Sequence, residues 1–159
     1  MAAPSSATFT TSDTAPPLVA AISPANNATG VLPGSVISVT FNEAIKTALF
    51  TTQHMTISTG GAPIGGTLSF NESSTAVTFT PAAPMATNST YNISVNGAED
   101  AAGNVMTQGY NSIFYTTDTI PPTLQLVDPG VVIEGSTVTI SANAAPTSDV
   151  ANVYFYKDG

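Results

Sequence analysis

The sequence predicts an all-β sandwich from three observations: its composition, the alternation of apolar and polar residues in short segments, and the turn residues between those segments. Thr and Ser together supply about a quarter of the 159 residues. Charged residues are only 8%, against roughly 25% in an average soluble protein. Thr is β-branched and suits half-exposed, pleated surfaces. Hydrophobic residues make up 42%, and their strand-like spacing argues against a disordered chain.

Seven short segments have the period-two pattern of a strand with one buried face. In one of them, Ile37, Val39 and Phe41 share a face and the residues between them are polar. Gly, Pro and Asn separate the segments, as expected for turns. The segment 43–50 (EAIKTALF) is the one helix-like stretch. The predicted strands are 18–23, 35–41, 54–58, 65–70, 75–80, 90–96 and 111–116.

Two end segments repeat each other. Residues 8–17 read TFTTSDTAPP and residues 113–122 read IFYTTDTIPP, so that Asp13 matches Asp118 at a separation of 105 residues. About 100 residues is the size of one immunoglobulin-like sandwich. Because Pro fixes φ and cannot sit in a central strand, the two Pro-Pro pairs mark domain edges.

The repeat therefore predicts tandem immunoglobulin-like antiparallel β-sandwiches. Residues 1–15 are the terminal strand or remnant of a preceding repeat, and residues 16–120 form one complete domain. Residues 121–159 begin a second domain with its first three strands at 123–127, 135–142 and 150–156. Three strands cannot bury an apolar face alone. Either the sequence is an excerpt of a repeat array, or strand donation between subunits completes the sheet.

Charge and composition exclude several classes of partner. The formal net charge is −8, and Lys46 and Lys157 are the only basic residues, too few to neutralise phosphates of nucleic acids. No apolar run approaches the length of a membrane-spanning helix, so we expect no membrane insertion. The chain has no Cys, which excludes thiolate metal sites and disulfides. No signal peptide is visible, and an exported parent would carry it elsewhere.

Several motifs together resemble one family. They are FNEAI (41–45), FTP (79–81), NSTY (88–91), DAAGN (100–104) and the closing Phe-x-Thr-x-Asp-x-x-Pro-Pro. With these motifs the chain resembles, over residues 16–122, the bacterial Ig-like domain of S-layer proteins of the SbsA type. The tail resembles another bacterial Ig-like repeat, of a kind found in adhesins and secreted polysaccharide-active enzymes. The resemblance implies a bacterial protein that is extracellular or on the cell surface, with spacer, surface-layer or adhesion roles and no conserved catalytic site.

Acidic residues near the domain edges are candidate calcium ligands. Glu99, Asp100 and Asn104 lie in or beside the DAAGN turn, and Asp13 and Asp118 precede the Pro-Pro pairs. Calcium takes six to eight oxygen ligands of these types. A bound Ca²⁺ would stiffen the junction between repeats.

The same residues have a purely local interpretation. Asp100 can accept backbone N–H bonds in an Asx-turn, with Gly103 at positive φ. The sequence lacks the DxDxDG pattern of a dedicated calcium loop. Both interpretations stay open at this stage.

No constellation of residues indicates catalysis. His54 is the one histidine, it opens a predicted strand, and the chain has no G-x-S-x-G elbow, so a Ser–His–Asp site is not expected. Pairs of carboxylates are unavoidable by chance among ten acidic residues. We therefore predict that the chain is not an enzyme.

The tyrosines offer an alternative to a purely structural role, because exposed aromatic rings can stack on sugars. Tyr91 falls on the predicted core face, and its NSTY context resembles a corner tyrosine. The sequence thus predicts a non-catalytic extracellular structural repeat, with neighbouring repeats as its partners. The alternative is a carbohydrate- or protein-binding accessory module of a secreted polysaccharide-active enzyme. Self-assembly by strand donation, or contact with a surface glycan, is a further expected interaction.

Overall fold

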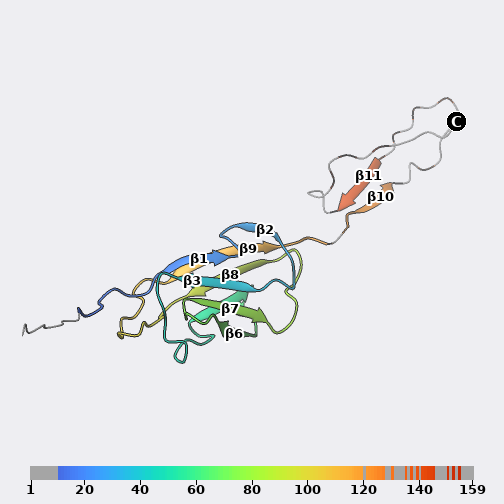
Figure 1. The fold of residues 1–159 in the computed structure, drawn as a ribbon. Coiled ribbons are helices and arrows are strands. Elements are labelled where there is room, and N and C mark those ends of the chain that lie inside the picture. Colours follow the sequence, from blue (N-terminus) through green and yellow to red (C-terminus); the bar gives the residue numbers. More distant parts are fainter. Residues whose placement is uncertain are drawn as a thin grey trace, which may run out of the picture. The chain divides into compact units, whose positions relative to one another are not determined.

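The computed structural model describes residues 11–119, 121–127 and 141–145, together with the single residues 130, 135, 137, 139, 150, 152 and 154. The chain divides into two units, Met1–Asp118 and Thr119–Gly159. The first unit is a two-layered β-structure (Figure 1). No helix long and apolar enough to cross a membrane occurs in the described part of the chain.

Four strands form one sheet of the first unit, and all its neighbouring strands are antiparallel. In spatial order they are β1 (Val19–Ser23), β3 (Ile37–Phe41), β7 (Ala76–Pro81) and β6 (Gly66–Phe70).

Five strands form the second sheet, in which β2 pairs with β9 in parallel and the other neighbours are antiparallel. The chain changes sheets between β1 and β2, where the Ser23–Pro24 peptide bond is cis. In spatial order the strands are β2 (Ala28–Val31), β9 (Tyr110–Thr116), β8 (Thr90–Val95), β4 (Met55–Thr59) and β5 (Ala62–Pro63).

All seven predicted strands are confirmed, each within two residues of its predicted limits. The strands β2 and β5 were not predicted. They are four and two residues long, too short for an alternation to be recognised, and β2 contains Gly30 at a φ of 69°. Such short edge strands take their structure from the neighbouring strand.

The helix predicted for residues 43–50 is wrong. Ile45 instead forms an isolated β-bridge with Asp100, and its N–H donates to the carbonyl of Ser74 at 2.9 Å. The N–H of Lys46 donates to the carbonyl of Glu99 at 2.7 Å. Ile45 and Phe50 are both buried, so packing and long-range hydrogen bonds override the local helical preference of this segment.

The core lies between the two sheets and follows the predicted alternation. Ile37, Val39 and Phe41 of β3 are buried, and the intervening residues are not. Tyr91 stacks on Phe114 with ring centroids 5.4 Å apart. The Tyr91 hydroxyl accepts a hydrogen bond of 2.8 Å from the N–H of Ala86, five residues upstream, which confirms the corner tyrosine.

In the second unit, β10 (Thr123–Val127) pairs antiparallel with β11 (Ser141–Ala145). The strand predicted at 123–127 is therefore confirmed. Most residues of the two strands predicted at 135–142 and 150–156 lie outside the described residues. Residues 1–10 of the predicted N-terminal remnant also lie outside them.

Candidate functional site

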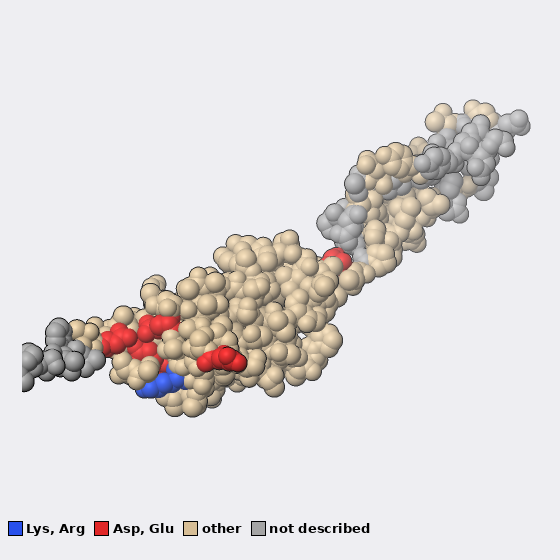
Figure 2. All heavy atoms as spheres, in the orientation of Figure 1, with Lys and Arg blue, Asp and Glu red and all other residues tan. Residues whose placement is uncertain are grey.

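Three carboxylates from distant parts of the chain meet at one end of the first unit. Asp13 comes from the segment before β1, Glu43 follows β3, and Asp100 lies in the loop after β8. One carboxylate oxygen from each lies within 4.8 Å of the others. Figure 2 shows acidic side chains gathered at the end of the unit from which the N-terminal segment extends. We call these three residues the acidic cluster.

Hydrogen bonds within the DAAGN turn hold the carboxylate of Asp100 in place. The backbone N–H of Asn104 donates to Asp100 Oδ1 at 2.8 Å, and Asn104 Nδ2 donates to Asp100 Oδ2 at 2.7 Å. Gly103 has a φ of 94°, which a residue with a Cβ adopts only with strain. The local interpretation of this turn is thus confirmed: Asp100 accepts backbone hydrogen bonds and Gly103 takes positive φ. Asp100 itself is 2% exposed.

Asp13 reaches the cluster because its segment lies against the same turn. Asn104 Nδ2 also donates to the backbone carbonyl of Asp13 at 3.2 Å. Farther along the segment, the N–H of Leu18 donates to Asn42 Oδ1 at 2.6 Å, and the carbonyl of Leu18 accepts from the N–H of Asn42 at 3.0 Å. Two Asn residues from separate loops therefore hold the segment that precedes the first strand.

The pKa values of Glu43 and Asp100 are shifted in opposite directions. Burial raises the pKa of Glu43, and the negative charges of Asp13 and Asp100 raise it further, while a hydrogen bond from Asn42 opposes them. Burial also acts to raise the pKa of Asp100, but hydrogen bonds from Asn104, Gly103 and Ala102 outweigh it and lower that pKa. A carboxylate that accepts several N–H bonds is stabilised in its charged form.

The other two predicted ligands do not join the acidic cluster of the described residues. Glu99 forms an ion pair with Lys46. Asp118 follows the carboxyl end of β9, whereas the acidic cluster lies beyond the opposite end, since Tyr110 at the start of β9 pairs with Val95 at the end of β8. Seven residues of strand separate the two ends by about 20 Å. The structure therefore brings together Asp13, Asp100 and Asn104, without Glu99 and Asp118.

Glu43 was missed as a candidate ligand. It belongs to FNEAI (41–45), a segment whose sequence indicated only a family resemblance. Its position beside Asp100 depends on the β-bridge between Ile45 and Asp100, a long-range pairing with no local signal in the sequence.

The cluster has part of what calcium coordination requires. Calcium–oxygen distances are about 2.4 Å, so two ligands of one ion lie up to about 4.8 Å apart, and the three carboxylates meet that limit. However, both oxygens of Asp100 already accept hydrogen bonds from Asn104, and three side chains are fewer than the six to eight oxygens that calcium takes. The calcium site stays a prediction.

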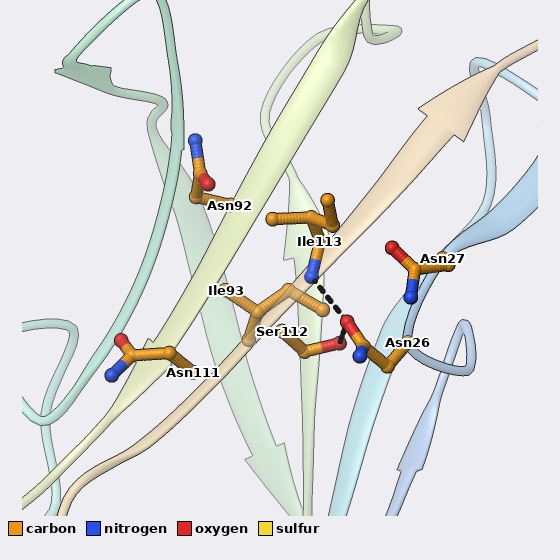
Figure 3. Close-up of a pocket in the computed structure, with 7 residues that line it drawn as sticks. All are labelled: Asn26, Asn27, Asn92, Ile93, Asn111, Ser112 and Ile113. Carbon is orange, nitrogen blue, oxygen red and sulfur yellow. Dashed lines mark hydrogen bonds between the residues drawn. The ribbon is translucent and has the colours of Figure 1, made fainter.

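A second feature is a hollow lined by amides. Four Asn side chains, from the segment before β2 and from β8 and β9, surround Ile113 (Figure 3). The hollow has a volume of about 260 Å³. Asn26 Oδ1 accepts hydrogen bonds from the N–H of Ile113 at 3.1 Å and from Ser112 Oγ at 3.3 Å, which fixes one wall. The four are Asn26, Asn27, Asn92 and Asn111.

His54 is held by local packing. Its ring stacks on Phe50 with centroids 5.4 Å apart, and its Nδ1 accepts a hydrogen bond from the N–H of Thr51 at 3.1 Å. Within the described residues it does not join the carboxylates of the acidic cluster. These contacts within one short segment are those of a packed side chain.

Comparison with known proteins identifies the fold and its family. The chain matches the family described as bacterial Ig-like domain over residues 13–117, about two thirds of its length. It belongs to that family. The family predicted from the sequence motifs is confirmed, and so is the all-β, immunoglobulin-like sandwich. No curated protein matches the chain.

Two solved structures with a fold similar to that of this bacterial Ig-like chain come from a surface-layer protein. Domains 1–6 of surface layer protein SbsC superpose with a TM-score of 0.50 at 17% identity, covering 70% of this chain and 15% of that one. The N-terminal part of the same S-layer protein gives the same score and identity, with 26% of its chain covered. With 17% identity, these superpositions show that the fold is shared and nothing more. The chain spans only 15% and 26% of the length of these two solved chains.

Proposed function

We propose that this bacterial Ig-like chain is a non-catalytic structural spacer of a bacterial surface-layer, adhesin or other large secreted protein. The observation that carries the proposal is the path of the chain through the first unit. The segment before β1 lies against the Asn42 and Asn104 loops, at the end of the sandwich where β9 begins. The chain leaves the sandwich after β9, at the other end (Figure 1). Entry and exit at opposite ends are what a head-to-tail array of domains requires.

Two further observations support a spacer. The pattern T-x-D-T-x-P-P, with Asp13 and Asp118 in matching positions, recurs after 105 residues, so the connection on one side of the domain resembles that on the other. The fold is shared with domains of a surface layer protein. Location at the cell surface and a structural role in this chain are inferred from that likeness together with the family.

Labelling of intact cells tests the proposed location. An antibody against the 159-residue chain is applied to the source bacterium before and after permeabilisation, with an antibody against a cytoplasmic protein as the control. We expect full labelling of intact cells. Labelling that appears only after permeabilisation would contradict the proposal.

The length of the parent polypeptide separates the spacer from the accessory module of a secreted enzyme. An immunoblot of secreted and surface fractions, followed by mass spectrometry of the band, identifies the flanking domains. Tandem Ig-like domains on both sides would support the spacer. A polysaccharide-cleaving domain in the same polypeptide would favour the accessory module.

A further inference from the structure

The outer surface of the five-stranded sheet is polar without being charged. The residues that alternate with its buried side chains form three cross-strand rows, which follow from the pairing of β4, β8 and β9. They carry hydroxyl and amide groups, one Ile and one Tyr, and no charge. We call this surface the amide face, and its residues are Thr56, Ser58, Thr90, Asn92, Ser94, Asn111, Ile113 and Tyr115.

The hollow described above lies on this face. Asn92 pairs across the strands with Ile113, and Asn111 pairs with Ser94, so the two amides flank the Ile side chain. Figure 3 shows Asn26 and Asn27 on the far side of Ile113 from Asn92. The side-chain amides of Asn27, Asn92 and Asn111 make no hydrogen bond with any described residue.

These three amides are a concentrated set of uncommitted hydrogen-bonding groups. Each has two N–H donors and one carbonyl acceptor. The fourth amide, that of Asn26, has its oxygen fixed by β9, which leaves its NH₂ group as a donor. A ligand with many hydroxyl groups, each of which both donates and accepts, matches such a lining.

The opposite sheet provides an internal contrast. Its outer surface carries Ser, Thr and Ala, with no amide and no aromatic residue. A general preference for polar residues on exposed strands accounts for that surface. It does not account for the gathering of amides around one hollow on the other sheet. The outward residues of β3, β7 and β6 are Ser38, Thr40, Ala76, Thr78, Thr80, Thr67 and Ser69.

We propose that the amide face binds a neutral polysaccharide, with one sugar ring in the hollow beside Ile113. A volume of about 260 Å³ lies below the range for drug-sized ligands, about 300 to 1,000 Å³, and suits a single ring. Tyr115, two residues beyond Ile113 on the same face and 36% exposed, supplies an aromatic surface for a neighbouring ring.

Charge restricts the ligand further. The face has no cationic group to neutralise a uronate or a phosphate, and the chain's net charge of −8 repels acidic polymers. Neutral sugars carry no such penalty. The ligand is therefore an uncharged hexose or pentose polymer rather than an acidic one.

Titration of the ¹⁵N-labelled 159-residue chain tests the proposal. The probes are the hexasaccharides of cellulose, starch amylose, xylan and chitin, with hexagalacturonate as the acidic control. We expect at least one neutral probe to shift the side-chain amide signals of Asn92 and Asn111 at millimolar concentration. Hexagalacturonate should leave them unchanged.

Two double variants place the binding on the face. Asn92→Ala with Asn111→Ala removes two amides from exposed strand positions and should weaken binding about tenfold or more. The matched pair Ser69→Ala with Thr78→Ala, on the opposite sheet, should bind as the unchanged chain does. Circular dichroism and thermal melting confirm that both variants are folded.

Three results would overturn the proposal. One is the absence of shifts with all four neutral probes, and another is equal binding of hexagalacturonate. The third is binding that the Asn92 and Asn111 substitutions leave intact. None of these results bears on the spacer function, because the cell-labelling experiment measures location and does not depend on a ligand.

Discussion

The interior of the sandwich and its acidic cluster are built on different principles. Interior residues such as Val39, Val77 and Ile93 are fully buried in one hydrophobic cluster, whose packing does not depend on directional bonds. The cluster instead depends on particular hydrogen bonds, such as those between Asn104 and both oxygens of Asp100. The interior should therefore respond to lost volume, and the cluster to lost acceptors and to pH. This difference also decides which parts of the structure the sequence could predict.

Truncation of Phe114 should have the largest effect. Phe114 is fully buried and stacks on Tyr91, so Phe114→Ala should lower the free energy of unfolding by about 3 to 5 kcal/mol. The neighbouring Ile113→Ala, on the half-exposed face of the same strand, is the control and should cost about 1 kcal/mol or less. Urea unfolding followed by circular dichroism measures both. Equal effects would show that the interior is not the main source of stability.

The interior was predictable because its signal is local. Alternation in β3, β7 and β8 placed Ile37, Val77 and Tyr91 on the buried side, and a period of two needs only neighbouring residues to be recognised. Strands as short as β5, with two residues, have no period to detect.

The acidic cluster was only partly predictable, because it is assembled by long-range pairing. Asp100 and Asn104 stand close in the sequence, and their turn was correctly interpreted. The approach of Glu43 requires Ile45 to pair with a residue 55 positions away, and the local pattern of that segment indicated a helix. The amide hollow has the same origin, since Asn27 and Asn92 become neighbours only when β2 and β8 flank β9.

Asp100→Asn should have the next largest effect, and it should depend on pH. Both carboxylate oxygens of Asp100 accept hydrogen bonds, and an amide keeps only one acceptor. Hydrogen bonds lower the pKa of Asp100 below its ordinary value of 3.8. The stability linked to this ionisation is present above that value and is lost as the pH falls through the lower folded-state pKa.

Thermal melting between about pH 2 and pH 7 tests this expectation. The variant should melt below the unchanged chain at neutral pH, and the difference should shrink in acid. The N-terminal segment also contacts Asn104, so the same substitution should make residues before β1 more sensitive to protease. A constant difference at every pH would contradict the assignment to the ionised carboxylate.

Tyr91→Phe tests the corner hydrogen bond separately from the packing of the ring. The substitution keeps the stacking on Phe114 but removes the acceptor for the N–H of Ala86. We expect a loss of about 1 kcal/mol in the free energy of unfolding, well below that of Phe114→Ala. A loss as large as that of Phe114→Ala would mean that the corner hydrogen bond contributes as much stability as a buried ring, which would contradict this expectation.

Glu43→Gln should have the smallest effect, and its sign should be the opposite of the others. Burial, with the charges of Asp13 and Asp100, raises the pKa of Glu43 above its ordinary value of 4.5. For a carboxyl with a raised folded-state pKa, the linked stability is fully present below the unfolded value and is lost as the pH rises through the folded value. The neutral amide avoids that loss, so the variant should melt slightly higher than the unchanged chain near neutral pH and equally near pH 4.

The same variant decides whether the acidic cluster takes calcium. Calcium stabilises a protein only by binding its folded form more tightly, and a cation between the carboxylates would remove their mutual repulsion. The calcium hypothesis therefore predicts that millimolar Ca²⁺ raises the melting temperature of the unchanged chain. Glu43→Gln should reduce this rise. The control is Glu72→Gln, at a turn outside the cluster. If the unchanged chain has the same melting temperature in Ca²⁺ as in EDTA, the cluster acts only through hydrogen bonds and repulsion.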